Sequence, residues 1–568
     1  MFSTKPSIQQ LTALMLKAHI TQAVVCPGSR NAAIVHNLQA AGIECYEVTD
    51  ERSAGFFAIG LIEANGGKPV AVCVTSGSAV LNLSPAVSEA YYRMFPLLII
   101  TADRPPQWIG QMDGQTLPQS NAYGEMVAKS VSLPEPTNAE ERWYCNRLIN
   151  EAFIALQQTH RPVQINVPIT EPMFDFTAER LPNERLIEWT KSHASQEILT
   201  ETMREAWKNS NRVLIVIGQM LPDEMEEIGL LLADLGQKGC VVLAENLSNV
   251  QISDEMEDLY IGNFDEMLYA QHFETPDLVI TIGGHIVSKR LKQHLRKNPP
   301  QWHWHISPNG EVADLFVCCT HLIEATPQNL LSVLCKEDTA NLQLRQTYQN
   351  RMMCYADKIA NTDRKIPAFC DLKVLHDILP KIGNEWHLHV ANSSMVRNVQ
   401  LFFKGKNSIH CNRGVNGIEG SVSAAVGYWA SSRKPTMLLT GDLSFFYDQN
   451  ALWNKYIKSP ATPLRILVLN NGCGQIFHHL PGLASPYLSN SIAAHHETTA
   501  EGIAKECGAT YMAVSCKESD AEAALQQTLQ VFLQTDKSVK ILEVFTDSSV
   551  NEQAYKEYYH QLKSIQEL

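Results

Sequence analysis

Short apolar runs alternate along the chain with longer segments in which apolar residues recur every three or four positions. The segments 51–67 and 141–158 show the second pattern, which is typical of helices. The short runs, which we expect to form strands, lie at 23–27, 69–76, 97–103 and 162–168, at 212–218, 240–246, 276–284 and 301–307, and at 385–392, 435–442, 463–471 and 539–547. Buried strands separated by helices are typical of parallel sheets. The pattern predicts an α/β protein with three doubly wound parallel-sheet domains.

Two breaks separate the three sets of strands. A polar stretch covers residues 174–208, and a charged segment covers residues 352–367. A chain of 568 residues is also too long for a single hydrophobic core. We therefore expect an N-terminal domain over residues 1–180, a central α/β domain over 181–345 and a C-terminal domain over 346–568.

The first and third sets share an order of features. Residues 68–100 and 434–467 both run from Lys-Pro through a strand and a Thr, then through a helical segment with Asn, to Pro-Leu and a second strand. A loose internal duplication accounts for this similarity. We expect the first and third domains to be alike.

The composition excludes several classes of protein. Lys and Arg number 46 against 60 Asp and Glu, and the net charge of -14 argues against a nucleic-acid partner. No run of about 18 apolar residues and no signal-like N-terminus occur, so we expect a cytoplasmic protein without a membrane span. The 14 cysteines show no C-x-x-C spacing and are interpreted as reduced thiols.

A carboxylate follows one strand of the third set. Asp442 ends the run 435–442, and Asn471 ends the run 463–471. Ligands bind at the carboxyl ends of parallel strands, so two neighbouring strands would bring these side chains together. Hard oxygen donors with an open side suit Mg²⁺, which completes its octahedron with substrate phosphates. Helix capping or a turn would explain either residue alone, but the pair predicts a metal site.

Gly441-Asp442-Leu443 and Asn470-Asn471 resemble the G-D-G…N-N signature of thiamine diphosphate enzymes, with Leu443 in place of the last Gly. The resemblance implies Mg²⁺ or Mn²⁺ bound by Asp442, Asn471 and the backbone carbonyl of Cys473. It also implies that residues 1–180 bind the pyrimidine of the cofactor and residues 346–568 its diphosphate and metal. The residues expected to bind the cofactor are Glu51, Thr75, Ser76, Gly77, Ile418, Gly441, Asp442, Leu443, Ser444, Asn471, Ile476 and Phe477.

Thiamine diphosphate enzymes carry a glutamate that bonds N1′ of the aminopyrimidine. The candidate for this catalytic role is Glu51, which lies in YEVTDERSAGFFAIG at the end of an expected strand. A helix dipole would also favour an acid in the first turn of the following helix. A carboxyl buried at this position would have a raised pKa, as proton sharing with the ring nitrogen requires.

Several stretches narrow the resemblance. CPGSRNAAIV, TADRPP, NRGVNGIEGSVSAAVG and NNGCGQIF are similar to the 2-succinyl-5-enolpyruvyl-6-hydroxy-3-cyclohexene-1-carboxylate synthases of menaquinone biosynthesis. The resemblance implies a carboligase that decarboxylates 2-oxoglutarate and adds the succinyl semialdehyde unit to isochorismate. It also implies a homodimer or homotetramer whose active sites lie at the subunit interface.

Six cations on these motifs suit dicarboxylate substrates, because an Arg fork binds a carboxylate through two hydrogen bonds. By resemblance, the residues expected to bind isochorismate are Ser29, Arg30, Arg104, Gln115, Lys289 and Arg290. Ser393, Arg397 and Arg413 are expected to bind carboxylates derived from 2-oxoglutarate. Which arginine serves which carboxylate stays open.

Some features depart from related families. The pairs His478-His479 and His495-His496 are interpreted as surface or loop histidines. Gly283-Gly284 lacks the G-x-G-x-x-G fingerprint, so flavin or NAD binding is not expected. Two alternatives remain: an acetolactate synthase or 2-oxoacid decarboxylase on the same fold, and a non-catalytic diphosphate-binding regulator, which would not need Glu51.

Overall fold

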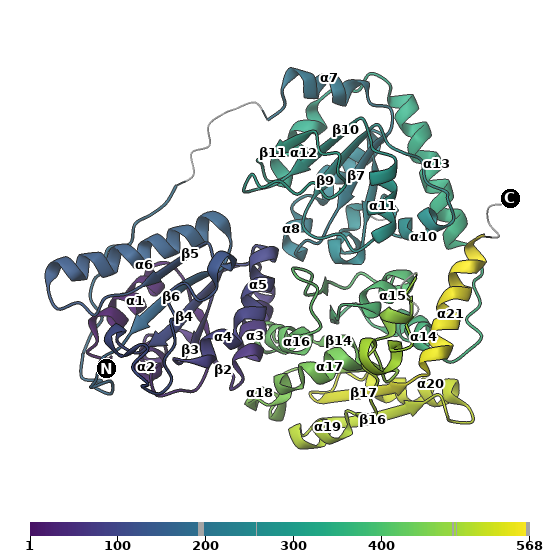
Figure 1. Ribbon diagram of the computed structural model, residues 1–568. Helices are drawn as coiled ribbons and strands as arrows, with labels where there is room; N and C mark the ends of the chain where they lie inside the picture. The colour runs from purple at the N-terminus through teal and green to yellow at the C-terminus, as the bar shows by residue number, and fades with distance from the viewer. Residues whose placement is uncertain (191–197, 257, 480–481, 484, 564–568) are drawn as a thin grey trace.

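The computed structural model describes residues 1–190, 198–256, 258–479, 482–483 and 485–563. Three sheets follow one another along the chain, each with helices on both faces (Figure 1). The strand pairs within these sheets are parallel. This architecture confirms the predicted fold class. In the described part of the chain, no helix is both long enough and apolar enough to cross a membrane.

The first sheet has the strand order β2-β1-β3-β4-β6-β5. Its strands are β1 (Gln22–Val25), β2 (Glu44–Glu47), β3 (Val70–Val74), β4 (Leu97–Asp103), β5 (Lys129–Ser132) and β6 (Val163–Pro168). One face packs against α1 (Pro6–Lys17), α2 (Ala32–Ala40) and α6 (Ala139–Thr159). The other face packs against α3 (Glu51–Ala64), α4 (Ser78–Asn82) and α5 (Ser84–Arg93).

The middle sheet has the order β11-β10-β9-β7-β8. Its strands are β7 (Val213–Ile217), β8 (Val241–Ala244), β9 (Leu278–Ile282), β10 (Trp302–Ile306) and β11 (His321–Ile323). One face packs against α7 (Glu201–Asn209), α8 (Pro222–Glu226), α9 (Gly229–Gln237) and α12 (Pro327–Lys336). The other packs against α10 (Phe264–Tyr269), α11 (Lys289–Lys297) and α13 (Leu342–Ala360). The expected domain boundary at residue 345 thus falls inside α13.

The third sheet has the order β13-β12-β14-β15-β17-β16. Its strands are β12 (His387–Val390), β13 (Ile409–His410), β14 (Thr436–Gly441), β15 (Leu464–Asn470), β16 (Thr510–Ser515) and β17 (Val539–Phe545). One face packs against α14 (Asp371–Ile378), α15 (Ser394–Phe402) and α20 (Ala521–Phe532). The other packs against α16 (Ser421–Ser432), α17 (Asp442–Tyr447), α18 (Lys455–Lys458) and α19 (Glu501–Cys507). The last helix, α21 (Ser548–His560), reaches the core under the middle sheet through Tyr558 and Tyr559.

The first and third sheets have the same topology. Numbered in chain order within each sheet, the strands of both lie in the order 2-1-3-4-6-5. The two similar sequence segments correspond to β3 with β4 and to β14 with β15, which occupy equivalent places. The predicted likeness of the first and third domains is therefore confirmed at the level of topology.

These two domains share one hydrophobic core. Helix α3 of the first domain packs against α16 of the third, as Figure 1 shows. The helices approach closely because glycines face the partner backbone: a Cβ at Gly60 would lie 2.1 Å from Ala424 O, and a Cβ at Gly427 would lie 2.2 Å from Phe57 O. Phe56 and Phe57 fill the space around this crossing.

Four strands were not predicted from the sequence, namely β5, β11, β13 and β16, and each lies at the edge of its sheet. The expectation that a strand ends at Glu51 was also wrong. Strand β2 ends at Glu47, and Asp50 caps α3 by accepting a hydrogen bond from Ser53 N at 2.9 Å. Glu51 is therefore the first residue of a helix.

Candidate active site

The strand ends of the third sheet bring Asp442 and Asn471 together. Gly441 lies opposite Leu469 in the register of β14 and β15, so Asp442 and Asn471 each follow the end of one of two neighbouring strands. The backbone N–H of Asn471 donates to Asp442 Oδ2 at 3.1 Å. The two residues are adjacent, as the motif requires, and their roles as metal ligands stay predictions.

Backbone groups fix the orientation of the Asp442 carboxylate. Its side chain is buried, and it also accepts hydrogen bonds from Leu443 N at 2.6 Å and from Gly472 N at 2.8 Å. Gly472 has a φ of +73°, a conformation that favours glycine. In the loop after β15, the residue with a left-handed backbone conformation is therefore Gly472. Cys473 does not have a positive φ, so its backbone conformation does not require glycine.

A second buried carboxylate orients the amide of Asn471. Asn471 Nδ2 donates to Asp371 Oδ2 at 3.1 Å, and the Thr546 hydroxyl donates to Asp371 Oδ1 at 2.6 Å. Burial raises the pKa of Asp371 to about 6. Because the amide nitrogen of Asn471 donates to Asp371, the amide oxygen of Asn471 points away from Asp371.

A divalent metal fits this donor set. The Asp442 carboxylate, the Asn471 amide oxygen and the Cys473 carbonyl are hard oxygen donors, which suit Mg²⁺ or Mn²⁺. Among the described residues, no group of three or more His, Cys, Asp and Glu side chains could hold a metal ion. A site with so few protein ligands matches Mg²⁺ sites in which phosphate oxygens complete the coordination.

Cationic side chains gather between the middle and third domains. Arg413 is buried, donates to Asn392 Oδ1 at 2.8 Å, and has an Nε without a partner. Arg397 Nη1 donates to Val287 O at 3.3 Å, and burial followed by the nearby charge of Arg413 lowers its pKa. Burial also lowers the pKa of Lys292, and both arginines add to that effect. Glu245 opposes both shifts, and Asp265 opposes that of Arg397, but the pKa of each group is still lowered, so positive charge predominates in this cluster and suits an anionic ligand.

The cation cluster is connected to the metal site through the backbone. Asn392, which binds Arg413, also donates to Gly417 O at 2.8 Å. The next residue, Ile418, is 36% exposed, and its carbonyl accepts a hydrogen bond from Ser444 in the helix that begins at Asp442. Ser393 follows Asn392 and has a φ of +70°, and Ile476 and Phe477 follow the loop after β15. Ser393, Ile418, Ile476 and Phe477 therefore lie at the strand ends of the third sheet.

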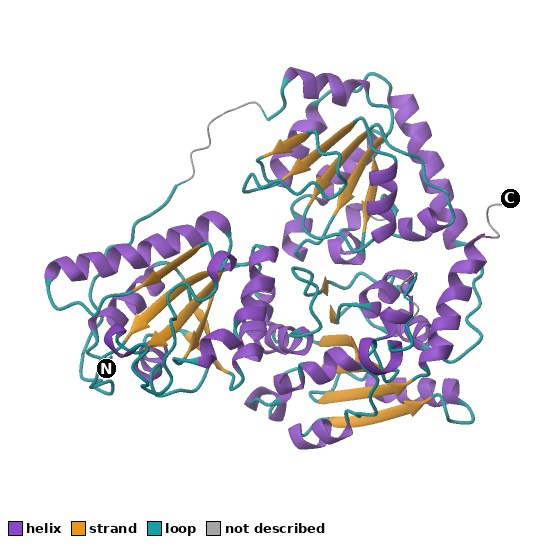
Figure 2. Ribbon diagram, viewed as in Figure 1, coloured by secondary structure: helices purple, strands orange, loops and turns teal. Residues whose placement is uncertain are grey.

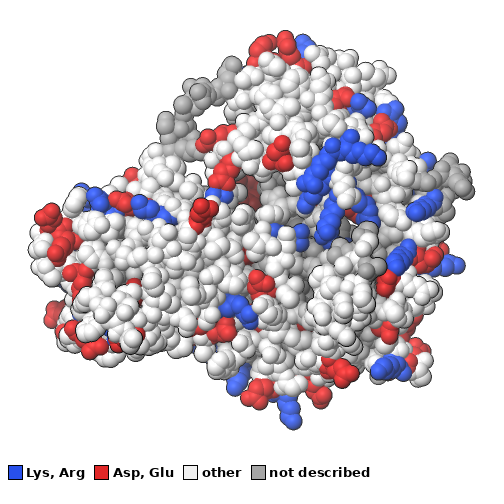
Figure 3. All heavy atoms as spheres, viewed as in Figure 1, with Lys and Arg blue, Asp and Glu red and all other residues white. Residues whose placement is uncertain are grey.

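The two predicted cations of α11 differ in their surroundings. Figure 3 shows Lys and Arg gathered where α11 lies in Figure 1. Lys289 is exposed, whereas Arg290 pairs with Asp265 and lies 4.4 Å from the centroid of the Tyr559 ring. Burial alone would lower the pKa of Arg290, but the charge of Asp265 outweighs this effect, and the pKa of Arg290 is raised. Arg290 therefore already has an acidic partner and an aromatic one.

The predicted residues of the first domain lie at the strand ends of the first sheet. Ser29 and Arg30 follow β1, Thr75 to Gly77 follow β3, and Arg104 follows β4. Arg30 is buried and donates to Ile169 O at 3.0 Å; burial and then the charge of Arg104 lower its pKa. Gln115 has a φ of +58° and lies against Gly77.

Glu51 begins α3 in the first domain, whereas Asp442 begins α17 in the third domain. The carboxylate of Glu51 is partly exposed and accepts a hydrogen bond from Asn82 Nδ2 at 3.2 Å. The arrowheads of the first sheet in Figure 2 point away from the third domain, so the two sets of strand ends face in different directions. Apart from Lys289 and Arg290 on α11, the structure therefore gathers the predicted residues into two groups, one at the strand ends of the first sheet and one at those of the third.

Comparison with known proteins identifies the family of the chain. The family described as "Thiamine pyrophosphate enzyme, N-terminal TPP binding domain" matches residues 7–124, and "Middle domain of thiamine pyrophosphate" matches residues 183–388. A 2-succinyl-5-enolpyruvyl-6-hydroxy-3-cyclohexene-1-carboxylate synthase of Phocaeicola vulgatus is 44% identical, with 100% of each chain covered. A synthase of the same name from Bacteroides thetaiotaomicron is 43% identical over 99% of this chain and 100% of its own length. Another from Flavobacterium psychrophilum is 34% identical over 98% of this chain and 99% of its own length.

The chain belongs to this synthase family. It is thus a thiamine diphosphate-dependent enzyme that forms carbon–carbon bonds.

Sequence reasoning missed three residues that this synthase places around the site. Asp371 orients Asn471, Lys292 lies within the cation cluster, and His496 lies 3.4 Å from Asp442. His496 lies in a loop, as the interpretation of this pair as surface or loop histidines allows, but its side chain is only 15% exposed and packs against Phe446. His478 is also largely buried and pairs with Glu552 at 3.6 Å, whereas the side chain of His479 lies outside the described residues. Of the three missed residues only Lys292 carried a signal, its position just after the motif cations Lys289 and Arg290.

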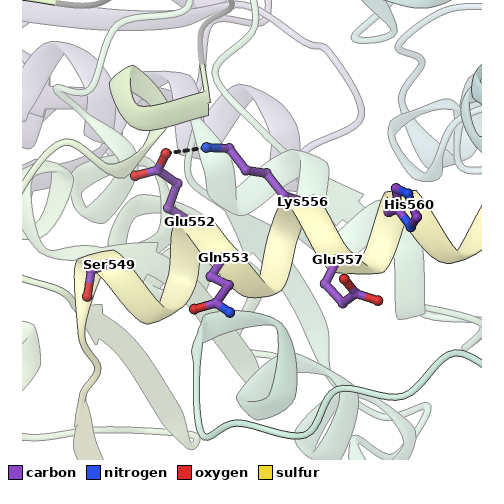
Figure 4. Close-up of a pocket in the computed structure, with 6 residues that line it drawn as sticks. All are labelled: Ser549, Glu552, Gln553, Lys556, Glu557 and His560. Carbon is purple, nitrogen blue, oxygen red and sulfur yellow. Dashed lines mark hydrogen bonds and ion pairs between the residues drawn. The ribbon is translucent and has the colours of Figure 1, made fainter.

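Two hollows lie elsewhere in the synthase. A cavity of about 410 Å³ opens between the first and middle domains, lined among others by Arg93, His160, Gly283 and Ser307. A shallow groove follows α21, where Glu552 and Lys556 pair with each other in Figure 4. Neither hollow is lined by a predicted site residue.

Proposed function

We propose that this enzyme decarboxylates 2-oxoglutarate and adds the succinyl semialdehyde unit to isochorismate, the reaction of menaquinone biosynthesis that gives 2-succinyl-5-enolpyruvyl-6-hydroxy-3-cyclohexene-1-carboxylate and carbon dioxide. The observation that carries the proposal is the 44% identity to a synthase of that name over the whole of both chains. Bound thiamine diphosphate supplies the nucleophilic carbon and the electron sink for this chemistry.

We assign the metal to the strand ends of the third sheet. Asp442, Asn471 and the carbonyl of Cys473 hold Mg²⁺ or Mn²⁺, and the metal anchors the cofactor diphosphate. Gly441, Leu443 and Ser444 lie beside this anchor, and Ile418, Ile476 and Phe477 provide its apolar surroundings. Asp371 keeps the amide oxygen of Asn471 turned toward the metal.

We assign the substrate carboxylates to the cations. Arg397 and Arg413 neutralise a carboxylate of 2-oxoglutarate, with Ser393 beside them, and their own mutual repulsion favours such an anion. Ser29, Arg30, Arg104, Gln115 and Lys289 bind isochorismate. Arg290 stays in this second set as a predicted residue, although Asp265 and Tyr559 already engage it.

Glu51 completes the site from the first domain. Its carboxyl shares a proton with N1′ of the cofactor pyrimidine, next to Thr75, Ser76 and Gly77. Because Glu51 and Asp442 belong to strand ends that face in different directions, we infer that a homodimer brings Glu51 of one chain to Asp442 of another.

Product identification tests the proposed reaction. The purified enzyme is supplied with thiamine diphosphate, Mg²⁺, 2-oxoglutarate and isochorismate, and the products are analysed by mass spectrometry. We expect a product with the combined mass of both substrates less carbon dioxide. A second assay supplies pyruvate instead. Formation of acetolactate or a free aldehyde there, without the expected product in the first assay, would assign the enzyme to the acetolactate synthase or decarboxylase group.

A further inference from the structure

The ring of His496 is held at the metal site. Its Nε2 lies 3.4 Å from Asp442 Oδ2. The ring packs edge-on against Phe446, with 5.4 Å between centroids, and Phe446 belongs to the helix that begins at Asp442. The ring orientation is therefore set by the same helix that carries the predicted metal ligand.

The segment that carries His496 is bonded to the loop after β15. Gly474 N donates to Ala493 O at 2.6 Å, and His496 N donates to Gly472 O at 2.8 Å. His495 Nδ1 also donates to Gly472 O at 2.8 Å. Three hydrogen bonds thus hold residues 493–496 against the loop that contains Cys473, so the position of the His496 ring is built into the site.

Hydrogen bonding also fixes which ring nitrogen carries the proton. The backbone N–H of Thr498 donates to His496 Nδ1 at 3.1 Å, so Nδ1 is an acceptor and the proton lies on Nε2. Asp442 Oδ2 already accepts two backbone N–H groups, and a separation of 3.4 Å exceeds ordinary hydrogen-bond length. Nε2 is consequently a buried donor without a partner. A buried donor left without an acceptor is unfavourable.

We propose that His496 donates a hydrogen bond from Nε2 to a diphosphate oxygen of the cofactor. This inference rests on the thiamine diphosphate site of the proposed function. The missing acceptor must arrive beside Asp442, and a metal held by Asp442 brings phosphate oxygens to that place. An Nε2 that carries a proton has no lone pair for a metal, so His496 binds the diphosphate and leaves the metal ion to the oxygen donors.

A pair of substitutions isolates this hydrogen bond. The amide nitrogen of Gln lies as many bonds from Cα as Nε2 does, whereas the amide of Asn reaches only the Nδ1 position. Wild type, His496→Asn and His496→Gln are titrated in a calorimeter with inorganic pyrophosphate and with thiamine diphosphate, both in the presence of Mg²⁺. We expect His496→Asn to weaken both affinities about tenfold to a hundredfold, the range for a hydrogen bond to a charged group. His496→Gln should recover most of the loss.

Two controls separate this role from others. His495→Asn keeps a donor for Gly472 O and should bind pyrophosphate as wild type does. Binding of Mn²⁺ alone, measured from the resonance signal of the free ion, should be the same in every variant. The proposal is overturned if His496→Asn binds pyrophosphate with wild-type affinity, if His496→Gln is as weak as His496→Asn, or if Mn²⁺ binding falls. Failure of the wild type to bind thiamine diphosphate would contradict the proposed function itself.

Discussion

At the residue scale, Glu51 has a role that can be tested apart from cofactor binding. Replacing Glu51 by Gln keeps the size of the side chain and removes the carboxyl that would share a proton with N1′. We expect exchange of the thiazolium C2 proton for deuterium, followed by NMR, to slow by at least about a hundredfold, with cofactor affinity within a few-fold of wild type.

A neighbouring carboxylate provides the control for Glu51. Glu47 ends β2 and pairs with Lys455 at 2.6 Å. Glu47→Gln should exchange the C2 proton at the wild-type rate. If Glu51→Gln also exchanges at that rate, another group performs the proton transfer.

Arg397 and Arg413 are the cations whose removal should affect substrate binding most directly. Each is largely buried next to the other, so loss of one leaves a substrate carboxylate without a charged partner in a poorly solvated place. We expect Arg397→Ala and Arg413→Ala each to raise KM for a dicarboxylate and to cost about 2 to 4 kcal/mol in kcat/KM.

Steady-state kinetics with both substrates checks this prediction. Arg351, which pairs with Glu274 at the surface, supplies the control substitution Arg351→Ala and should leave kcat/KM unchanged. Unaltered kinetics in both active-site variants would show that Arg397 and Arg413 have structural roles only.

At the scale of elements, the crossing of α3 and α16 should tolerate no added side chain. A methyl group at Gly427 would meet the backbone of Phe57, which cannot move aside as a flexible side chain could. We expect Gly427→Ala to lower the free energy of unfolding by about 1 to 3 kcal/mol in urea denaturation. The matched control is Gly502→Ala in α19, where no atom lies within 4 Å, and a similar loss there would contradict the packing explanation.

Asp448 connects α17 to α16 and should make stability depend on pH. Its buried carboxylate accepts hydrogen bonds from Ser423 N and Ser423 Oγ, both at 2.7 Å, and burial raises its pKa from 3.8 to about 6. A raised carboxyl pKa means that the folded state holds the proton more tightly, so this stabilisation is present at low pH and is lost as pH rises from about 4 to 6.

The isosteric variant Asp448→Asn removes this dependence. Relative to wild type, its free energy of unfolding should rise by about 2 kcal/mol between pH 4 and pH 7, measured by urea denaturation at each pH. Asp338→Asn removes an exposed carboxylate and serves as the control. If Asp448→Asn and wild type differ by the same free energy of unfolding at both pH values, burial does not raise the pKa of Asp448.

The sequence predicts the interior strands of the three sheets well and their edges poorly. Strands such as β4 and β15 are fully buried and appear as continuous apolar runs. At the edges, β13 has two residues, β11 has three, and β16 is mostly half-exposed, so none carries a strong apolar pattern. Short strands of this kind are defined by pairing with a neighbour, which a local pattern does not contain.

The same limit applies to the site. Asp442 and Asn471 could be predicted because each directly follows an apolar strand, and the fold makes such positions adjacent. Asp371 and His496 reach the site from α14 and from a loop far along the chain, so only the tertiary structure brings them there.

At the scale of the whole molecule, we propose that the two groups of site residues meet between two chains. The first and third domains have the same topology and share a core through α3 and α16, but their strand ends point in different directions. In a two-fold dimer, the first domain of each chain can meet the third domain of its partner, which gives two equivalent sites.

Complementation between inactive chains tests this arrangement. Glu51→Gln and Asp442→Ala chains are refolded separately and together, and dimers carrying both variants are verified by mass spectrometry. If the site is shared, a mixed dimer contains one site with both defects and one with neither. Random pairing makes half of the dimers mixed, and half of their sites are intact, so activity should recover to roughly a quarter of wild type. Activity that stays at the level of the separate variants, despite verified mixed dimers, would mean that each chain builds its own site.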